Sequence, residues 1–434
     1  MPSPRSRALP LLLAAAVALV TGWRLAAPAS RPGRASAAAR LDARAAGLAR
    51  DLLVVDTHID LPYRLEEHAG PREDVSQRTP GGDFDAVRAR QGGLDVAWMS
   101  IYVPSSLQTA GGARDLADSL IDLVEGLAAE HPGTFAVARG ADEAEAIARS
   151  GRIALPLGIE NAAAFEADLA NVAHFHGRGV RYATLVHAED NLICDSSYSD
   201  AQKRTWRGLS PFGAQVVAEM NRLGIMVDIS HVSDECFDAV LAATTAPVIA
   251  SHSSCRHFTP GFERNLDDER IRRLAENGGV IQINFGSGFL TAPANEWSSA
   301  AWDAEQAFRT ESGAREGSPE LAAWRAQYQE ERPFPRASVD DVVAHIEHVI
   351  ALAGVDHVGL GSDFEGVGPT TPSGLEDVSK YPNLFAKLLE RGHSEAEIEK
   401  IAGGNLMRVW RTVEARARQL QLESTPGAPP PEAR

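Results

Sequence analysis

Eight runs of apolar, largely β-branched residues recur along the chain, and hydrophobic and polar positions do not alternate regularly within them. Strands that are buried on both faces of a sheet have this pattern, so each run predicts a buried strand. The predicted strands are Leu52–Thr57, Leu94–Tyr102, Ile153–Ile159, Val180–Val186, Ile225–Ser230, Pro247–Ser251, Val280–Phe285 and His357–Ser362.

Between these runs, apolar residues at three- and four-residue spacing predict amphipathic helices. Ser210 followed by Pro211 is typical of a helix start, and Gly224 is typical of a helix end. Two capping boxes, which are a further helix-start signal, begin at Ser338 and Ser394. The predicted helices cover residues 113–130, 141–149, 211–223, 234–243, 339–352 and 395 to about 413.

This alternation of strands and helices implies a parallel sheet in an α/β fold. Eight strand–helix units in succession predict a closed (β/α)8 barrel of the TIM type, which we assign to residues 41–415 as a single catalytic domain. An open, doubly wound sheet is the alternative, and the lack of a Gly-rich nucleotide-binding motif after the first strand weakens it. A chain of 434 residues, 44% of them hydrophobic, is long enough for such a core.

One connection stands out by its length, because residues 286–337 separate the seventh strand from the next helix. Loops this long are uncommon in compact domains and are often lids or binding elements. The segment contains Trp297, Trp302 and Trp324. We interpret it as a long insertion, and its role stays open between a lid and a surface excursion or subunit contact, such as that of a homodimer.

The two ends of the chain differ in composition from the rest. Residues 1–40 contain six arginines and no acidic residue, and Arg5 and Arg7 precede the apolar run Ala8–Val20. This is typical of a secretory signal, and the run is shorter than the roughly 20 residues of a membrane span. We therefore expect export to the periplasm, the cell envelope or the medium, with an uncleaved membrane anchor as the alternative. Residues 416–434 are predicted to be a disordered Pro-rich tail.

The charge and cysteine content narrow the classes of protein to which the chain can belong. A net charge of -17 argues against a nucleic-acid partner. Three cysteines, Cys194, Cys236 and Cys255, allow at most one intramolecular disulfide, so the fold depends on its hydrophobic core.

Residues of the types that bind metals follow the predicted strands at one end only. In a barrel of parallel strands these ends share one rim, where catalytic groups lie. His58 and Asp60 would also point to the same side, because side chains two apart in a strand do so. This placement favours a metal centre over isolated hydrogen-bonded side chains. The candidates are His58, Asp60, Glu160, His187, His231, His252 and Asp363.

The remaining histidines fall in predicted helices, in loops or at a strand start, and we expect them to be solvated or locally hydrogen-bonded. The role of His257 stays open, because it is near Cys255. The rim candidates exceed the needs of one tetrahedral zinc ion. Two ions about 3.5–4 Å apart would use them, with one carboxylate bound to both. Such a pair generates hydroxide near neutral pH, which predicts hydrolysis of a carbonyl or phosphoryl centre.

Several segments from Leu52 to Val409, taken in order, resemble the membrane (renal) dipeptidase family of zinc peptidases, a branch of the metal-dependent hydrolase barrel superfamily. Each segment is modest evidence, but the ordered set is specific. The segments are DTHID, LGIEN, GVRYATLVH, GLSPFG, NRLGIMVDISHVS, APVIASHSS, the RN of Arg264–Asn265, DHVGLGSDFEG and GGNLMRV.

The resemblance implies a dipeptidase with two Zn2+ ions per chain, for which dipeptides with a C-terminal D-residue are candidate substrates. By this resemblance, His58 and Asp60 would bind one ion, His231 and His252 the other, and Glu160 would bridge them. It further implies that Asp363 handles the proton of the metal-bound water, that His187 stabilises the oxyanion, and that Arg264 binds the substrate carboxylate.

The sequence also departs from this family. Some members carry a tyrosine close to the substrate where this chain has Gly286, which predicts a wider pocket. Two further functions stay open. One is a related amidohydrolase that acts on N-acyl amino acids, lactones or β-lactams, and the other is a non-catalytic, metal-containing binding protein of the cell envelope.

Overall fold

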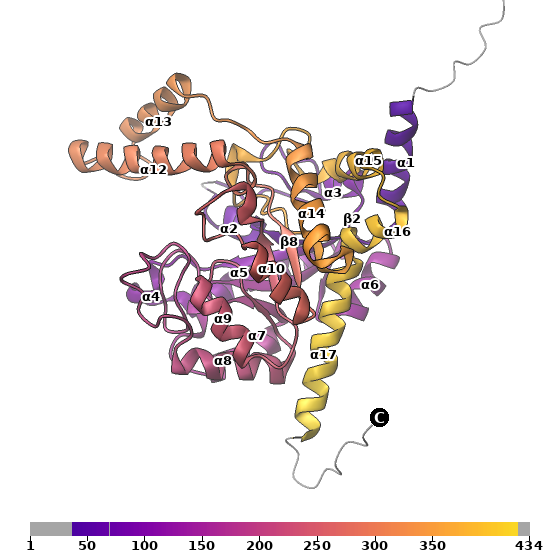
Figure 1. Cartoon of the computed structure of the whole chain (residues 1–434), viewed down its shortest axis with the longest axis horizontal. Coiled ribbons are helices and arrows are strands. Elements are labelled where there is room, and N and C mark those ends of the chain that lie inside the picture. The colour runs from indigo at the N-terminus through magenta and orange to yellow at the C-terminus, as the bar shows by residue number, and fades with distance from the viewer. Residues whose placement is uncertain (1–36, 69, 424–434) are drawn as a thin grey trace, which may run out of the picture.

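A sheet of parallel strands curls into a nearly closed barrel. Figure 1 shows the computed structural model of the chain. The structure describes residues 37–423 apart from residue 69. The order around the barrel is β1-β2-β4-β5-β6-β7-β8-β9, and β3 pairs with β4 outside this path. The strands are β1 (Val54–Ile59), β2 (Leu94–Tyr102), β3 (Phe135–Ala138), β4 (Ile153–Glu160), β5 (Val180–Thr184), β6 (Met226–Asp228), β7 (Ile249–Ser253), β8 (Val280–Ile283) and β9 (Val358–Leu360).

All eight predicted strands are present and parallel, which confirms the barrel of α/β type. The barrel closes between its first and last strands through two backbone bonds, from Asp60 N to Phe364 O at 2.9 Å and from Asp363 N to His58 O at 3.1 Å. β3 was not predicted, because its four residues are too few for a clear pattern. β6 is shorter than predicted, since the Asp228 carboxylate accepts the N–H of Ser230 and turns the chain there.

Helices surround the barrel, and four of those predicted begin and end where the sequence indicated: α5, α6, α8 and α9. Serine caps are present, with Ser210 Oγ accepting from Gly213 N at 2.8 Å and capping boxes at Ser338 and Ser394. The helices up to the end of the barrel's sixth unit are α1 (Ala37–Asp51), α2 (Leu61–Glu66), α3 (Ala86–Gly92), α4 (Leu107–Ala110), α5 (Ala113–Glu130), α6 (Ala141–Arg149), α7 (Ala170–Arg178), α8 (Pro211–Leu223), α9 (Asp234–Ala243) and α10 (Asp268–Glu276).

The predicted helix from residue 395 to about 413 is interrupted and longer than expected. A π-helical turn, η6 (Lys400–Gly404), separates α16 (Glu395–Glu399) from α17 (Asn405–Glu423). At Gly403 a Cβ would lie 2.6 Å from the carbonyl oxygen of Leu53, so the turn packs against the start of β1 where a side chain has no room. Because α17 continues to Glu423, residues 416–423 are helical, and the prediction that they belong to a disordered tail is wrong.

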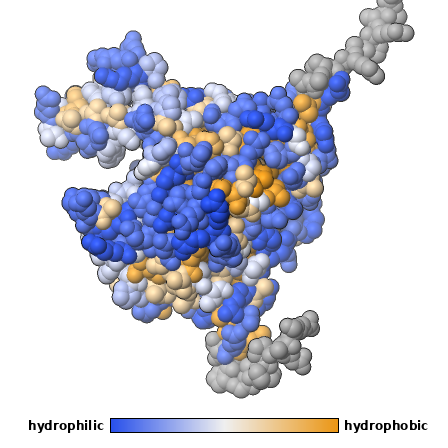
Figure 2. Space-filling model, viewed as in Figure 1, coloured by the Kyte–Doolittle hydropathy of each residue, from blue (hydrophilic) through white to orange (hydrophobic). Residues whose placement is uncertain are grey.

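The predicted long connection after β8 is helical rather than an irregular loop. It contains α11 (Ser287–Leu290), α12 (Ala292–Ser312) and α13 (Pro319–Glu331), and α14 (Val339–Ala353) follows. Figure 1 shows α12 and α13 projecting from the barrel as a two-helix arm. Trp297 and Trp324 pack against Tyr328 inside the arm, whereas Trp302 is 64% exposed. In Figure 2 apolar residues are visible along this arm, on a face that is otherwise mostly hydrophilic.

The barrel interior is filled below the rim by apolar and aromatic side chains, which form a core distinct from the one between strands and helices. Trp98 lies 4.7 Å from Trp410 of α17, ring to ring, so the C-terminal helix closes the lower end of the barrel. α15 (Tyr381–Arg391) packs on α1. No helix in the described part of the chain is long and apolar enough to cross a membrane. The predicted leader, apart from residues 37–40 in α1, and residues 424–434 lie outside the described residues.

Candidate binuclear metal centre

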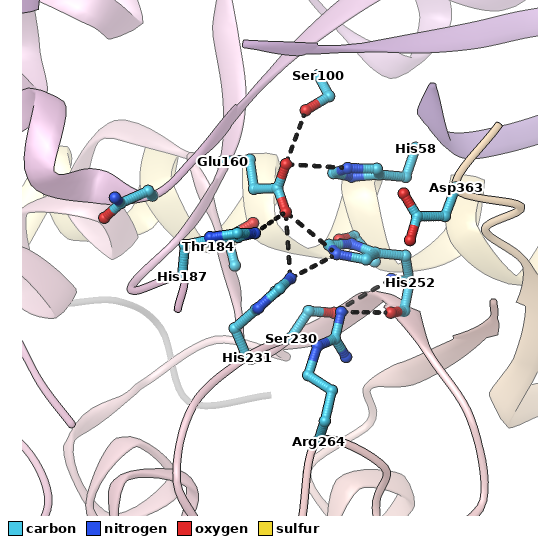
Figure 3. A network of polar contacts seen from close by, with 12 residues as sticks. His58, Ser100, Glu160, Thr184, His187, Ser230, His231, His252, Arg264 and Asp363 are labelled. Atoms are coloured by element: carbon cyan, nitrogen blue, oxygen red, sulfur yellow. Dashed lines mark hydrogen bonds and ion pairs between the residues drawn. The ribbon is translucent and has the colours of Figure 1, made fainter. Parts of the chain in front are cut away.

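The seven strand-end residues predicted as metal ligands or their neighbours converge at the carboxyl-terminal rim of the barrel. All of them except Asp60 are labelled in Figure 3. Their donor atoms form three overlapping groups, each with atoms within 4.8 Å of one another. The groups are His58 with Glu160 and His252, Glu160 with His187 and His231, and His58 with Asp60 and Asp363. The tertiary fold therefore gathers side chains that are far apart in the sequence around one point.

Glu160, the last residue of β4, lies at the centre of this cluster and is 4% exposed. Its Oε2 atom is 3.3 Å from His58 Nε2, and its Oε1 atom is 3.1 Å from His231 Nε2 and 3.4 Å from His252 Nε2. Burial raises the pKa of this carboxyl, but the neighbouring histidines outweigh burial and hold it well below its usual range. Glu160 is therefore an ionised carboxylate with one oxygen toward each half of the site.

Two imidazole nitrogens face each other on one side of Glu160, because His231 Nε2 and His252 Nε2 are 2.9 Å apart. Burial, helped by the positive charge of Arg264, lowers the pKa of both rings well below the ordinary value for histidine. Both rings are thus neutral at pH 7. Two neutral nitrogens and a carboxylate oxygen pointing at one small space form a typical donor set for a divalent cation.

The tautomer of His252 follows from its neighbours. Ser251 Oγ is 2.7 Å from His252 Nδ1 and 2.6 Å from Asp228 Oδ2. Because a carboxylate only accepts, the serine donates its proton to Asp228 and accepts the N–H of His252 Nδ1. The bare nitrogen of His252 is therefore Nε2, which faces Glu160. Partners of this kind orient metal-ligating histidines in proteins.

A second donor set lies on the other side of Glu160, where His58 Nε2 is 3.5 Å from Asp60 Oδ2. Among the described residues, His58 Nε2 and Asp60 Oδ1 are buried atoms without a hydrogen-bond partner. Unsatisfied buried polar atoms are rare in proteins, and a metal ion satisfies both kinds of atom. The buried His and carboxylate clusters of the site are therefore consistent with a binuclear metal centre.

Asp363 is held beside the second donor set by Asn284, whose Nδ2 atom donates to Asp363 Oδ2 at 2.7 Å. Burial and the nearby carboxylates of Asp60 and Glu160 raise the pKa of Asp363 well above its usual range. The backbone of Asp363 is left-handed, with φ of 63°, and strained backbone of this kind is typical of functional sites. Asp363 is thus a carboxyl group suited to holding and releasing a proton.

His187 and Arg264 border the cluster. His187 Nε2 is 3.6 Å from Glu160 Oε1, and burial together with the charge of Arg264 lowers the pKa of this ring. Arg264 is 2% exposed and donates to Ser253 Oγ at 2.7 Å and to the His252 carbonyl at 2.8 Å. Its guanidinium carbon is 5.3 Å from the Phe289 ring, so one face of the cation packs on an aromatic side chain.

A cavity of about 530 Å3 opens over the cluster. It is lined by residues from the strand ends, from α2, from α11 and α12, and from the segment after β9, including Tyr63, Tyr102, His187, Phe289 and Asp363. The wider pocket predicted from Gly286 stays a prediction, and a Cβ on Gly286 would lie 2.7 Å from Val367 and 2.8 Å from Phe289. These two side chains lie directly beside Gly286.

Three contributors to the site were missed in the sequence. Asn284 directly follows β8, so the strand-end rule that selected the other residues would have found it. Tyr182 lies within β5 and reaches His58, and Phe289 lies in α11. Neither had a positional signal, since their contacts depend on how distant elements pack.

Comparisons with known proteins show what this chain is similar to. The model of the membrane dipeptidase family (peptidase family M19) matches residues 42–424. An uncharacterised dipeptidase of Schizosaccharomyces pombe is 35% identical over 392 residues, which cover 86% of this chain and 83% of the relative.

Two solved structures are similar over nearly their whole length. The probable dipeptidase PvdM from Pseudomonas aeruginosa has a TM-score of 0.74 and 26% identity, covering 87% of this chain and 99% of that one. A metallopeptidase from Rhodobacter sphaeroides, liganded with a phosphinate mimic of L-Ala-D-Ala, has a TM-score of 0.68 and 26% identity. The match covers 83% of this chain and 99% of that one.

Proposed function

This chain belongs to the membrane dipeptidase family, M19, and is a metallo-dipeptidase, and on this basis we propose its substrates and its metal. We propose that it uses two zinc ions to cleave dipeptides, including those with a C-terminal D-residue. The observation that carries the proposal is the position of Glu160, with one carboxylate oxygen toward His58 and the other toward His231 and His252. The D-residue is proposed because the Rhodobacter sphaeroides structure holds a mimic of L-Ala-D-Ala.

The residues divide into two ligand sets. His58 and Asp60 would hold one ion, His231 and His252 the other, and Glu160 both. Imidazole with carboxylate favours zinc over magnesium or calcium, which prefer all-oxygen sites. When bound, the two ions supply a hydroxide nucleophile at neutral pH and polarise the carbonyl of the scissile bond.

Asp363 is the proposed proton carrier. Its raised pKa favours uptake of a proton from the attacking water, and its position beside Asp60 places it within the same donor group as His58. It then passes the proton to the leaving amine nitrogen. Asn284 keeps the carboxyl oriented by its bond to Oδ2, which leaves Oδ1 for this transfer.

His187 and Arg264 are the proposed substrate contacts. The neutral His187 ring can donate one N–H to the carbonyl oxygen as negative charge develops there. Arg264 has five N–H donors, and its bonds to Ser253 and His252 use two of them. A guanidinium with further donors, packed on Phe289, is suited to binding the C-terminal carboxylate of a dipeptide.

The test is a panel of L-L and L-D dipeptides, N-acyl amino acids and a lactone without a carboxylate, given to zinc-loaded protein. We expect dipeptide hydrolysis. Cleavage of only acyl amino acids or lactones would favour the related amidohydrolase, and bound zinc without any hydrolysis would favour a binding protein.

Arg264 is tested in the same assay. Arg264→Ala should raise KM for dipeptides by about 10- to 100-fold, the loss expected for a charge-assisted hydrogen bond, with both ions still bound. Arg264→Lys, which keeps the charge but not the planar donors, should lie in between. Arg178→Ala is the control, because that guanidinium pairs with Asp118 on the outer helices. An unchanged KM in Arg264→Ala would exclude the carboxylate role.

We also propose that the protein is exported, on the basic and apolar composition of residues 1–40. Expression of the full chain in a bacterium, followed by fractionation and N-terminal sequencing, tests this. A shortened chain in the periplasm supports a cleaved signal, whereas an intact chain in the cytoplasm excludes export.

A further inference from the structure

A second group of metal-binding side chains lies outside the barrel rim. His257 lies in the 3-10 turn η2 (Arg256–Phe258), Asp268 is the first residue of α10, and His348 lies in α14. Their donor atoms are within 4.8 Å of one another. Three elements that are separate in the sequence therefore present two imidazoles and a carboxylate to one point at the surface.

The donor atoms of this group are close enough to share one ion after a small movement. His348 Nε2 is 2.8 Å from Asp268 Oδ1, and the rings of His257 and His348 are 4.4 Å apart at 23°. Donors bound next to each other on one tetrahedral zinc ion, at about 2.1 Å from it, lie roughly 3.4 Å apart. Little movement is needed to admit an ion, because all three side chains start from this arrangement.

The charges around the group leave the Asp268 carboxylate free for a cation. The neighbouring Asp267 is 2.6 Å from Arg270 Nη1 and 3.6 Å from Arg256 Nη1. In contrast, within the described part of the chain the Asp268 carboxylate has no arginine or lysine partner, and its ion pair is with His348. The arginines of this surface thus neutralise the adjacent acid and not the one that faces the histidines.

We propose that His257, Asp268 and His348 bind a third divalent cation, of the zinc class. The two imidazoles exclude magnesium and calcium, which prefer oxygen ligands. Water completes a tetrahedral coordination sphere, since His257 is exposed and His348 and Asp268 are half-buried. The site is independent of the proposed hydrolysis and does not share a ligand with the rim.

The ion would stabilise the segment that carries Arg264. This segment runs from η2 to α10, and both of its ends contribute a ligand, His257 and Asp268. The third ligand, His348, belongs to α14, which also packs on α10. A bound ion therefore fixes the segment to α14, so its predicted effect is on stability.

The experiment counts zinc per chain by mass spectrometry of the native protein after dialysis against buffered zinc. We expect three ions in the wild type and two in His257→Ala, His348→Ala and Asp268→Asn, which keeps the size of the side chain. Addition of zinc to protein with a filled rim site should raise the melting temperature of the wild type and leave that of His348→Ala unchanged.

The matched control is His131→Ala. His131 Nε2 is 3.2 Å from Asp74 Oδ1, so this is a surface His–Asp pair that belongs to none of the donor groups among the described residues. The control should bind as many ions as the wild type. Equal ion counts in the wild type and all three site variants would overturn the proposal. If His131→Ala lost as many zinc ions as the site variants, binding would be non-specific, and this would overturn the proposal too.

Discussion

The Tyr182 hydroxyl lies between His58 Nδ1, at 2.9 Å, and the carbonyl oxygen of Thr57, at 3.1 Å. A carbonyl only accepts, so the hydroxyl donates to Thr57 and accepts the N–H of His58 Nδ1. In the neutral ring, His58 Nε2, which faces Glu160, is therefore the nitrogen without a proton. Gly158 in β4 makes room for this contact, because a Cβ there would lie 2.0 Å from the Tyr182 ring.

Tyr182→Phe should weaken metal binding by about 10- to 100-fold, the usual effect of removing a partner that orients a ligating histidine. The ring still fills the barrel, so the fold should be unchanged. Competition with a chelator measures the affinity. Tyr381→Phe is the control, because its hydroxyl bonds to Asp56 and not to a ligand. Equal affinities in wild type and Tyr182→Phe would contradict the role.

Asp363→Asn should keep both ions but reduce kcat by about 10^2- to 10^4-fold, the usual range for loss of a general acid–base group. Asparagine cannot carry the proton, although it retains the shape and the contact with Asn284. Steady-state kinetics and metal analysis on one sample separate the two effects. Unchanged turnover would show that another group moves the proton.

Gly366→Ala should disrupt the rim site. Its Cβ would lie 2.2 Å from Asp60 Oδ2 and 2.4 Å from Asp363 Oδ1, closer than any non-bonded contact allows. We expect loss of one ion and of turnover by more than about a hundredfold, since both carboxylates must move. Gly177→Ala is the control, because no atom lies within 4 Å of the added carbon. An active Gly366→Ala with a full complement of ions would refute the packing argument.

The burial of His345 predicts that acid destabilises the fold. It was expected to be solvated or locally bonded, but it is buried, accepting from Cys255 N at 3.0 Å and bonding Leu290 O at 3.0 Å. Burial lowers the pKa of His345 to about 4. The His345 ring takes up a proton near pH 6.5 in the unfolded chain but only near pH 4 in the folded chain. The contribution of the neutral ring to the unfolding free energy is therefore complete above pH 6.5 and lost as the pH falls through 4.

The size of this effect is about 3 kcal/mol of unfolding free energy between pH 6.5 and 4. Between pH 6.5 and 4, the unfolding free energy of the wild type should fall by about 3 kcal/mol more than that of His345→Gln. The glutamine keeps a hydrogen-bond donor for Leu290. Urea denaturation at a series of pH values, in excess zinc, measures both. Parallel curves for the two proteins would mean that His345 does not titrate in this way.

Much of the fold could be predicted because local patterns act directly on local structure. Apolar runs became strands, and Ser210 and Ser338 cap helices as expected. The arm of α12 and α13 was not predicted, since its helices bury few residues and lack a strong apolar stripe. The break at η6 was also not predicted, and it lies where Gly403 closely approaches β1.

By itself, the sequence determined which residues form the rim cluster, because all parallel strands of a barrel end on one side and Glu160, His231 and His252 each stand at such an end. Only the tertiary structure decided which nitrogens of His58 and His252 face Glu160, since Tyr182 reaches His58 across 124 residues of chain. It also placed Val367 and Phe289 beside Gly286. These contacts depend on packing between distant segments, which no local pattern of residues encodes.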